Sequence, residues 1–237
     1  MTFREYLIEA GGETGWKMEL VKTSLEDARD FAVPLFEKFG RDLYKEIPNF
    51  DENYLFAQKK AKLGKLDRKD MPVVPDTKED IKELQKHLKN GLIDINKPYS
   101  KPIKGNDPFP QGLSGKEAEE WLHNGLRDGA KKDDTIKVTK EKIPAQNLKI
   151  LQSQIYFDKS ITSIAQFGAK GTKDFLKSTF FVISRDNFVL DGNHRFLSTM
   201  LLEPTFKVTG IKIDLNQKEL HPLLLSYSDS QGNERNV

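Results

Sequence analysis

The stretch VLDGNHRFLST (residues 189–199) places a glycine and four polar side chains where a short apolar run gives way to a helical apolar period. Gly192 allows the backbone to turn sharply and to approach a ligand closely. The next residues, Asn193, His194 and Arg195, fall in the first turn of the expected helix. Backbone N–H groups there lack intrahelical acceptors, and the helix dipole places partial positive charge at this end of the helix. Arg195 adds a bidentate cation, and His194 adds a donor that titrates near neutral pH. The combination predicts an anion site, most naturally for phosphate.

Asp191 leaves two interpretations open. As a helix N-cap, its carboxylate would accept hydrogen bonds from the N–H groups of Asn193 or His194. Beside a phosphate it would repel, unless Mg²⁺ bridges the two groups or the carboxylate acts as a base on an attacking hydroxyl. A cation in the first turn, such as Arg195, opposes the helix dipole unless an anion is present, which favours a ligand site. The spacing alone does not decide, because Asp-Gly is also an ordinary turn dipeptide.

The elements around this stretch follow from the apolar pattern. STFFVISRDNFVLDG predicts two short strands joined by a turn at 184–187, and HRFLSTMLL predicts a helix. FKVTGIKIDL predicts a further strand with a bulge at Thr209–Gly210, where its apolar phase slips. NQKELHPLLLSY predicts a closing helix with Asn216 and Glu219 as its capping box. With the strand pattern of TIKVTKEKIP, these segments predict an α+β region from residue 134 to 237.

The sequence before residue 134 predicts helices followed by a linker. Residues 1–93 predict helices, and residues 94–133 predict a proline- and glycine-rich linker with one short helix. A helix beginning at Thr23 or Ser24 contains Pro34, which predicts a kink or two shorter helices. The segment DTKEDIKELQKHLKNG predicts an amphipathic helix with His87 on its exposed side.

Composition narrows the function classes. The 237 residues include no cysteine, which excludes disulfides, thiolate catalysis and cysteine-ligated metal centres. The net charge of +2 gives no global argument for a nucleic-acid partner. No apolar run has the length of a membrane span. Arg4 and Glu5 lie where a signal peptide would need its apolar segment. These features predict a cytoplasmic protein that does not enter a membrane.

One local basic run could contact a phosphate backbone. Its cations are Lys59, Lys60, Lys62, Lys65, Arg68 and Lys69. Such runs are usually solvated helix ends and loops, and only two aromatic residues, Tyr54 and Phe56, lie nearby for base stacking. The run is therefore a weak prediction of DNA binding.

VLDGNHRFLST resembles the signature of the ParB/sulfiredoxin superfamily. Its members carry G-x-x-R before a helix, as G-C-H-R-Y in sulfiredoxins, G-E-R-R in ParB proteins and D-G-H-H-R in ParB-like free-serine kinases. The last form is the most similar, and only Asn193 departs from it. IPAQNLKILQSQIYFDKSITSIAQFG resembles the opening of the family, a strand, a P-S-Q-like turn and a helix. Ile161–Ile164 matches the V-x-S-L of sulfiredoxins, while Lys159 lies one residue earlier than the family lysine. The resemblance covers about residues 136–226.

The resemblance implies a small mixed-sheet α+β domain of the ParB/sulfiredoxin type with a mainly helical N-terminal extension. It implies that Gly192, His194 and Arg195 grip a nucleotide phosphate, and that Asp191 lies beside the transferred phosphate or its Mg²⁺. The further candidate contacts are Asn193, Ser163, Lys159 and Gln154. The implied cofactors are Mg²⁺ and a nucleoside triphosphate, either ATP or CTP.

Several functions of that family do not fit this sequence. Sulfiredoxin activity is excluded because Asn193 stands where the reactive cysteine would be. The arginine pair of the ParB proteins is also missing. We therefore expect a nucleotide-binding protein with Mg²⁺-dependent phosphoryl transfer or nucleotide hydrolysis. The alternatives are a ParB-like DNA nuclease and a non-catalytic module that binds DNA or protein through the anion site and the basic run.

Overall fold

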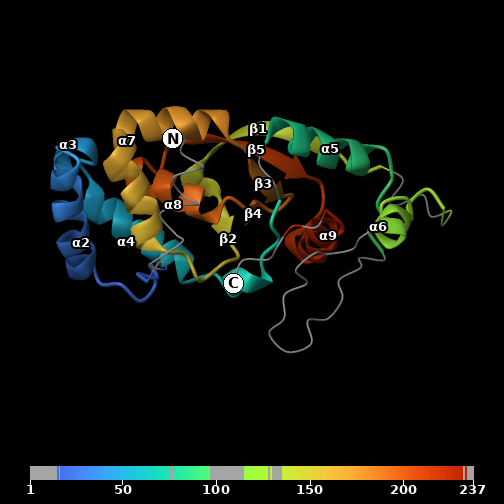
Figure 1. Cartoon of the computed structure of the whole chain (residues 1–237), viewed down its shortest axis with the longest axis horizontal. Coiled ribbons are helices and arrows are strands. Elements are labelled where there is room, and N and C mark those ends of the chain that lie inside the picture. The colour runs from blue at the N-terminus through green and yellow to red at the C-terminus, as the bar shows by residue number, and fades with distance from the viewer. Residues whose placement is uncertain are drawn as a thin grey trace. The chain divides into compact units, whose positions relative to one another are not determined.

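The computed structural model of the chain describes residues 15, 17–74, 77–96, 115–127, 129, 135–231 and 233. Much of the predicted linker lies outside these residues. The α-helices are α2 (Leu25–Lys38), α3 (Leu43–Glu46), α4 (Phe50–Ala61), α5 (Lys78–Lys89), α6 (Gly115–Trp121), α7 (Phe157–Ser178), α8 (Asn193–Leu202) and α9 (Gln217–Ser230). The strands are β1 (Val138–Pro144), β2 (Lys149–Ile150), β3 (Phe181–Ser184), β4 (Phe188–Asp191) and β5 (Lys207–Ile213), with 3-10 turns η1 (Arg68–Asp70) and η2 (Ala145–Asn147). The α+β class predicted from the sequence is confirmed (Figure 1).

Contacts group the chain into two compact units, and each unit is built from segments far apart in the sequence. The first unit takes its residues from Met1–Leu66, Lys142–Phe180 and Gly192–Thr209. The second unit takes its residues from Asp67–Glu141, Phe181–Asp191 and Gly210–Val237. Both units draw on residues from either side of the predicted boundaries at 93/94 and 133/134. The division of the chain at those boundaries stays a prediction.

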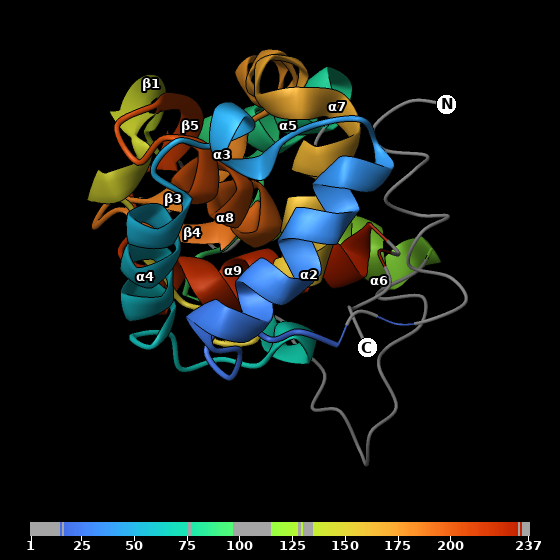
Figure 2. The same cartoon turned by 90° about the vertical axis from the view of Figure 1, so that its left-hand side faces the viewer.

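The first unit is mainly helical, and its core is aromatic. Phe157, at the start of α7, packs its ring against Phe31 of α2 and against Phe50 and Tyr54 of α4, with centroid distances of 5.2–6.3 Å. Figure 2 shows α2, α3 and α4 grouped with α7 and α8. The α8 helix contacts both α7 and α4 and lies at the centre of this unit. Residues of the N-terminal helices and of the C-terminal α+β segment thus share one apolar core.

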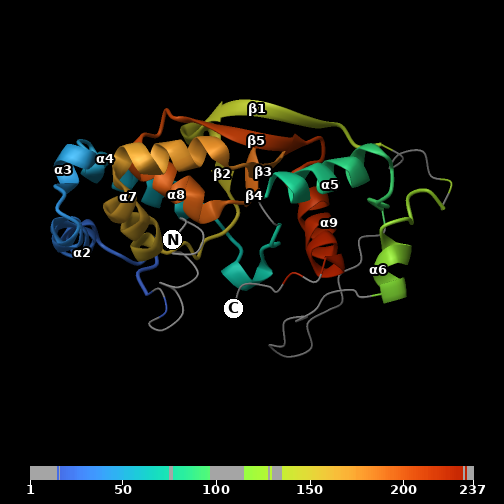
Figure 3. The same ribbon diagram turned by 45° about the horizontal axis from the view of Figure 1, so that its top comes forward.

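The second unit contains most of the sheet. The five strands form one mixed sheet, in which β3 is antiparallel to β4 and parallel to β5. Most of β1 belongs to this unit and lies on the other side of β5 (Figure 3). The predicted turn between β3 and β4 is confirmed. Asn187 has a positive φ of 68°, and the hydroxyl of Ser184 accepts a hydrogen bond from the N–H of Phe188 at 2.9 Å.

The helices α5 and α9 bury their apolar faces in the second unit. Ile81, Leu84 and Leu88 of α5 are buried, as the amphipathic pattern predicts. The prediction that His87 is exposed is wrong. Its side chain is only 12% exposed, and its ring packs edge-on against Tyr227 of α9 with 5.8 Å between centroids.

The helix α2 runs continuously through Pro34, which excludes two shorter helices and leaves the kink as a prediction. The register of the β3–β5 pair is regular from Phe181 opposite Gly210, but it begins after Thr209, so the bulge at Thr209–Gly210 stays a prediction. Val208–Ile211 are all buried, so a strand without alternation there also accounts for the slip in apolar phase.

None of the helices in the described ranges combines the length and the apolar character that a bilayer crossing requires.

Candidate functional site

The start of α8 has the backbone conformation that the motif predicts. Gly192 is the N-cap residue, with φ 101° and ψ 21°, a left-handed conformation that a side chain would strain. Gly192 itself has no side chain to cap the first turn of α8, and that turn contains no acidic residue. Asp191 thus stands one residue before the N-cap position, and both interpretations of its carboxylate stay predictions. Asn193, His194 and Arg195 occupy the first turn, as expected.

Other helices of the chain begin differently. α2 and α9 each have a capping box, and α5 has a threonine cap that accepts a backbone N–H. An acidic residue stands in the first turn of α2, α3, α4, α5, α7 and α9. Each acid places a negative charge near the positive end of its helix dipole, and this attraction stabilises the helix by about 0.3–1 kcal/mol. In α8 the same position carries an arginine and a histidine instead.

His194 is held in place by the residues that lead into α7. Its Nε2 accepts a hydrogen bond from the N–H of Tyr156 at 3.2 Å. Its ring stacks on the ring of Tyr156, with 10° between the planes and 6.0 Å between centroids. Because Nε2 accepts, the imidazole is neutral in this arrangement and carries its proton on Nδ1. The donor nitrogen of His194 is therefore Nδ1.

The glutamines of the Q-S-Q turn support Tyr156. The side-chain amide of Gln154 donates to the phenol oxygen of Tyr156 at 3.0 Å, and the amide of Gln152 donates to the carbonyl of Gln154. The turn and the D-G-N-H-R motif are thus joined through one tyrosine. Gln154, a predicted ligand contact, acts in this structure on the residue that orients His194.

The α7 and α8 helices are also joined through serine hydroxyls. Ser160 Oγ and Ser198 Oγ each donate to the carbonyl of His194 at 3.2 Å. Ser163, a predicted phosphate contact, is 1% exposed, and its hydroxyl donates to the carbonyl of Lys159 within α7 at 3.1 Å. Lys159 lies in the first turn of α7 and is partly exposed. The phosphate contacts that the resemblance implies for Ser163 and Lys159 stay predictions.

Asn193 contributes a buried acceptor at the first position of α8. Its side chain is 6% exposed, and its Oδ1 finds no hydrogen-bond partner within the described part of the chain. A buried amide oxygen without a donor costs about 1–3 kcal/mol. The amide is therefore positioned for a donor that the described residues do not supply.

Asp158, which no sequence pattern marked, lies in the first turn of α7 and holds the backbone of residues 17 and 18 against it. Its buried carboxylate accepts the backbone N–H of Lys17 at 2.8 Å and that of Met18 at 3.4 Å. The backbone of the same segment pairs with the α7 approach, because Phe157 N–H donates to Met18 and Leu20 N–H donates to Ile155. No local pattern could have revealed these contacts, since their partners lie about 140 residues apart.

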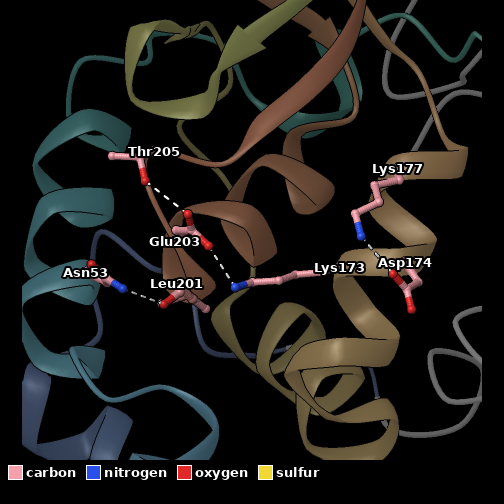
Figure 4. A network of polar contacts seen from close by, with 7 residues as sticks. All are labelled: Asn53, Lys173, Asp174, Lys177, Leu201, Glu203 and Thr205. Atoms are coloured by element: carbon pink, nitrogen blue, oxygen red, sulfur yellow. Dashed lines mark hydrogen bonds and ion pairs between the residues drawn. The ribbon is translucent and has the colours of Figure 1, made fainter.

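The far end of α8 is held by side chains on neighbouring helices (Figure 4). Asn53 of α4 donates its amide to the carbonyl of Leu201 at 2.8 Å. Lys173 of α7 forms an ion pair with Glu203, the C-cap residue, at 2.7 Å. Thr205 Oγ1 donates to the same carboxylate at 3.2 Å. These contacts fix the position of α8 within the first unit.

Asp191 is the last residue of β4 and belongs to the second unit, while Gly192 begins the next segment of the first. It stands opposite Val182 in the β3–β4 pair. Over the described ranges, no three histidine, aspartate or glutamate side chains are placed to hold a metal ion. A Mg²⁺ ion at Asp191 would need the oxygens of a bound phosphate among its ligands.

The basic run is divided between the two units. Lys60 donates to the carbonyls of Gln146 and Leu148 in the first unit, and burial lowers the pKa of its amine. Lys62 donates to Gln58. Lys59, Lys62 and Lys65 belong to the first unit, and Arg68 and Lys69 to the second. Lys60 thus has a structural role, and the DNA contact stays a prediction.

Comparison of the chain with protein-family models, with curated proteins and with solved structures yields no match.

Proposed function

We propose that the start of α8 binds the phosphate end of a nucleoside triphosphate, and that the chain transfers or hydrolyses the terminal phosphate with Mg²⁺. The observation that carries the proposal is the first turn of α8. It follows a left-handed glycine that has no capping side chain, contains no acidic residue, and bears Arg195 and His194 where other helices carry an acid. A phosphate at this position would accept the backbone N–H groups and offset the dipole and the arginine together.

Two neighbouring residues support the proposal. Asn193 has a buried Oδ1 that lacks a donor among the described residues, and a ribose hydroxyl or a metal-bound water would supply one. His194 is held as a neutral imidazole with its proton on Nδ1, through the bond from Tyr156. It would act as a fixed hydrogen-bond donor to a phosphate oxygen. In this assignment Tyr156 and Gln154 are positioning residues for His194.

Asp191 is the proposed metal and catalytic residue. Mg²⁺ in phosphoryl-transfer sites is commonly held by one or two carboxylates together with phosphate oxygens and water. Asp191 lies one residue before the glycine, so its carboxylate is adjacent in sequence to the proposed phosphate position. The metal would neutralise charge that develops on the transferred phosphate, while Arg195 stabilises the same charge from α8.

The binding step is tested by thermal unfolding of the whole chain with ATP or CTP and Mg²⁺. At a nucleotide concentration of about 100 Kd, binding adds about 2.7 kcal/mol and raises Tm by roughly 5–10 °C. Arg195→Ala should raise Kd by about tenfold or more, since a hydrogen bond to a charged group contributes about 1.5–3 kcal/mol. Arg127→Ala is the matched control, because it removes the same side chain from an exposed position outside α8. The absence of a Tm shift with every nucleotide tested would contradict the proposal.

The chemical step is tested separately with Asp191→Asn. This variant should bind nucleotide within a few-fold of the wild type and lose release or transfer of the terminal phosphate. Retention of full turnover in Asp191→Asn would remove this residue from the mechanism while leaving the binding site intact.

A further inference from the structure

The second unit contains a groove that is separate from the start of α8. It has a volume of about 470 Å³, a size typical of small-molecule sites. Its walls come from the end of α5, the beginning of β1 and the end of β5. Its apolar lining residues are Ile95, Ile136, Val138 and Leu215. Ile136, Val138 and Leu215 are 5–6% exposed and Ile95 is partly exposed, so the apolar body of a ligand would cover the apolar surface that they leave open.

Two lysines stand at this groove. Lys89 is the last residue of α5, and Lys137 directly precedes β1. The N–H of Ile136 donates to the carbonyl of Leu88 at 2.9 Å. Lys89 directly follows Leu88 and Lys137 directly follows Ile136, so this hydrogen bond holds the backbones of the two lysines close together. Both lysines are exposed, and within the described ranges neither side chain has a hydrogen bond or an ion pair. Two neighbouring cations repel one another, and an anion between them would convert the repulsion into attraction.

Two acidic residues beside the groove, Asp214 and Glu141, are offset by other cations. Asp214 lines the groove and pairs with Arg185 at 3.7 Å. Beside it lies a smaller hollow of about 110 Å³, where Glu141 pairs with Lys212 at 3.8 Å. With these two pairs balanced, the charges of Lys89 and Lys137 remain as the net charge of the described residues that line the groove. The field that these residues produce is therefore positive.

We propose that this groove binds a small amphipathic anion, with a carboxylate or phosphate head between Lys89 and Lys137 and an apolar body over the isoleucine, valine and leucine side chains. The proposal concerns a second site and does not depend on nucleotide binding at α8. The apolar lining distinguishes the expected ligand from inorganic phosphate, and the lysines distinguish it from a neutral ligand.

The test is isothermal titration of the whole chain with four probes: octanoate, phenyl phosphate, inorganic phosphate and octanol. Octanoate or phenyl phosphate should bind at least about tenfold more tightly than inorganic phosphate and octanol. In the double variant Lys89→Ala/Lys137→Ala, the Kd of the amphipathic anion should rise by about tenfold to a hundredfold, because two charge-assisted contacts are lost. Lys82→Ala, at an exposed position on the same helix, should leave the Kd unchanged.

A third variant separates the two sites. Arg195→Ala should not alter binding of the amphipathic probe, because that residue lies in the first unit. If neither amphipathic anion binds, the groove is not a ligand site. If inorganic phosphate binds as tightly as the amphipathic anions, the apolar lining plays no part. If the lysine double variant binds as the wild type does, the proposed head-group position is wrong. Each of these results overturns the proposal.

Discussion

Two helical segments of the first unit begin after a glycine with positive φ, and they treat the positive end of the helix dipole differently. α7 is interrupted at Gly168, which has φ 71° and ψ 168°, and its second part begins at Ala169. There the carboxylate of Glu46 accepts the N–H of Ala169 at 2.7 Å and the guanidinium of Arg41 at 3.0 Å. A helix start, an arginine and an anion are thus assembled from the chain itself.

The start of α8 also follows a glycine and has an arginine in its first turn, but its N-cap residue has no side chain and its first turn has no acid. The α7 segment shows how this protein completes such a start when the role is structural. The α7 segment thus shows that a helix that begins after a glycine, with an arginine beside it, can bind a carboxylate through its first backbone N–H and the guanidinium. On the proposed function, the α8 start would take an equivalent oxyanion from a ligand.

The largest expected effect comes from breaking the α7 side of the comparison. At Gly168 an added Cβ would lie 2.7 Å from a guanidinium nitrogen of Arg41, and the φ/ψ pair belongs to a region nearly exclusive to glycine. Gly168→Ala should therefore both strain the backbone and displace the arginine from Glu46. We expect a loss of about 2–4 kcal/mol in the free energy of unfolding.

Urea unfolding measures that loss. Gly171→Ala is the matched control, because its Cβ would meet its nearest neighbour at an ordinary 3.4 Å within regular helix. Equal stability of the two variants would show that the break at Gly168 is not a constraint on the fold.

How far the sequence predicts this architecture depends on the range of each interaction. The helix start at Ser24 and the capping box of Asn216 and Glu219 are confirmed, because a cap is decided within four residues. The strand pair around Asn187 and the helix after Gly192 are confirmed for the same reason. In each case the residues that interact are neighbours in the chain.

The interactions that the sequence analysis missed join distant segments. The break at Gly168 is stabilised by Glu46, 122 residues earlier, and no local turn signal marks it. His194 is oriented by Tyr156, whose role appears only once α7 and α8 are packed together. Local patterns identified the phosphate-binding motif as a candidate. They could not identify the residues that hold it.

A second, smaller effect sharpens the comparison. Glu46→Ala would leave the second part of α7 without the carboxylate that accepts the N–H of Ala169. The loss should be about 1–3 kcal/mol, because the N–H of Ala169 and the half-buried Arg41 both lose their acceptor. In buffers with acetate instead of chloride, the variant should regain part of its Tm while the wild type changes little.

Glu37→Ala, at an exposed position on α2, controls for removal of one acidic charge. If the acetate response of Glu46→Ala equals that of Glu37→Ala, the second part of α7 does not bind an external anion. The α7 segment would then cease to be a guide to the α8 start.

The smallest effect concerns the far end of α8, where the contacts serve the fold alone. The ammonium of Lys173 donates to Glu203 and lowers the pKa of that carboxyl below its ordinary value of 4.5. Because the folded-state pKa is lowered, the pair stabilises the fold above about pH 4.5, and this contribution is lost as the pH falls through the folded-state pKa. The carboxylate side chain is 43% exposed, so the contribution is about 0.2–1 kcal/mol.

Lys173→Met removes the charge and keeps the apolar stem. Urea unfolding at pH 7 should show the variant less stable than the wild type by this amount, and the difference should shrink as the pH falls through the lowered pKa of Glu203. Lys207→Met, an exposed lysine at the start of β5, should show no such pH dependence. Nucleotide affinity should be equal in Lys173→Met and in the wild type, because this pair lies at the opposite end of α8 from Arg195. A weakened affinity in Lys173→Met would mean that the two ends of the helix are coupled, and that the separation between a structural end and a ligand-binding end does not hold.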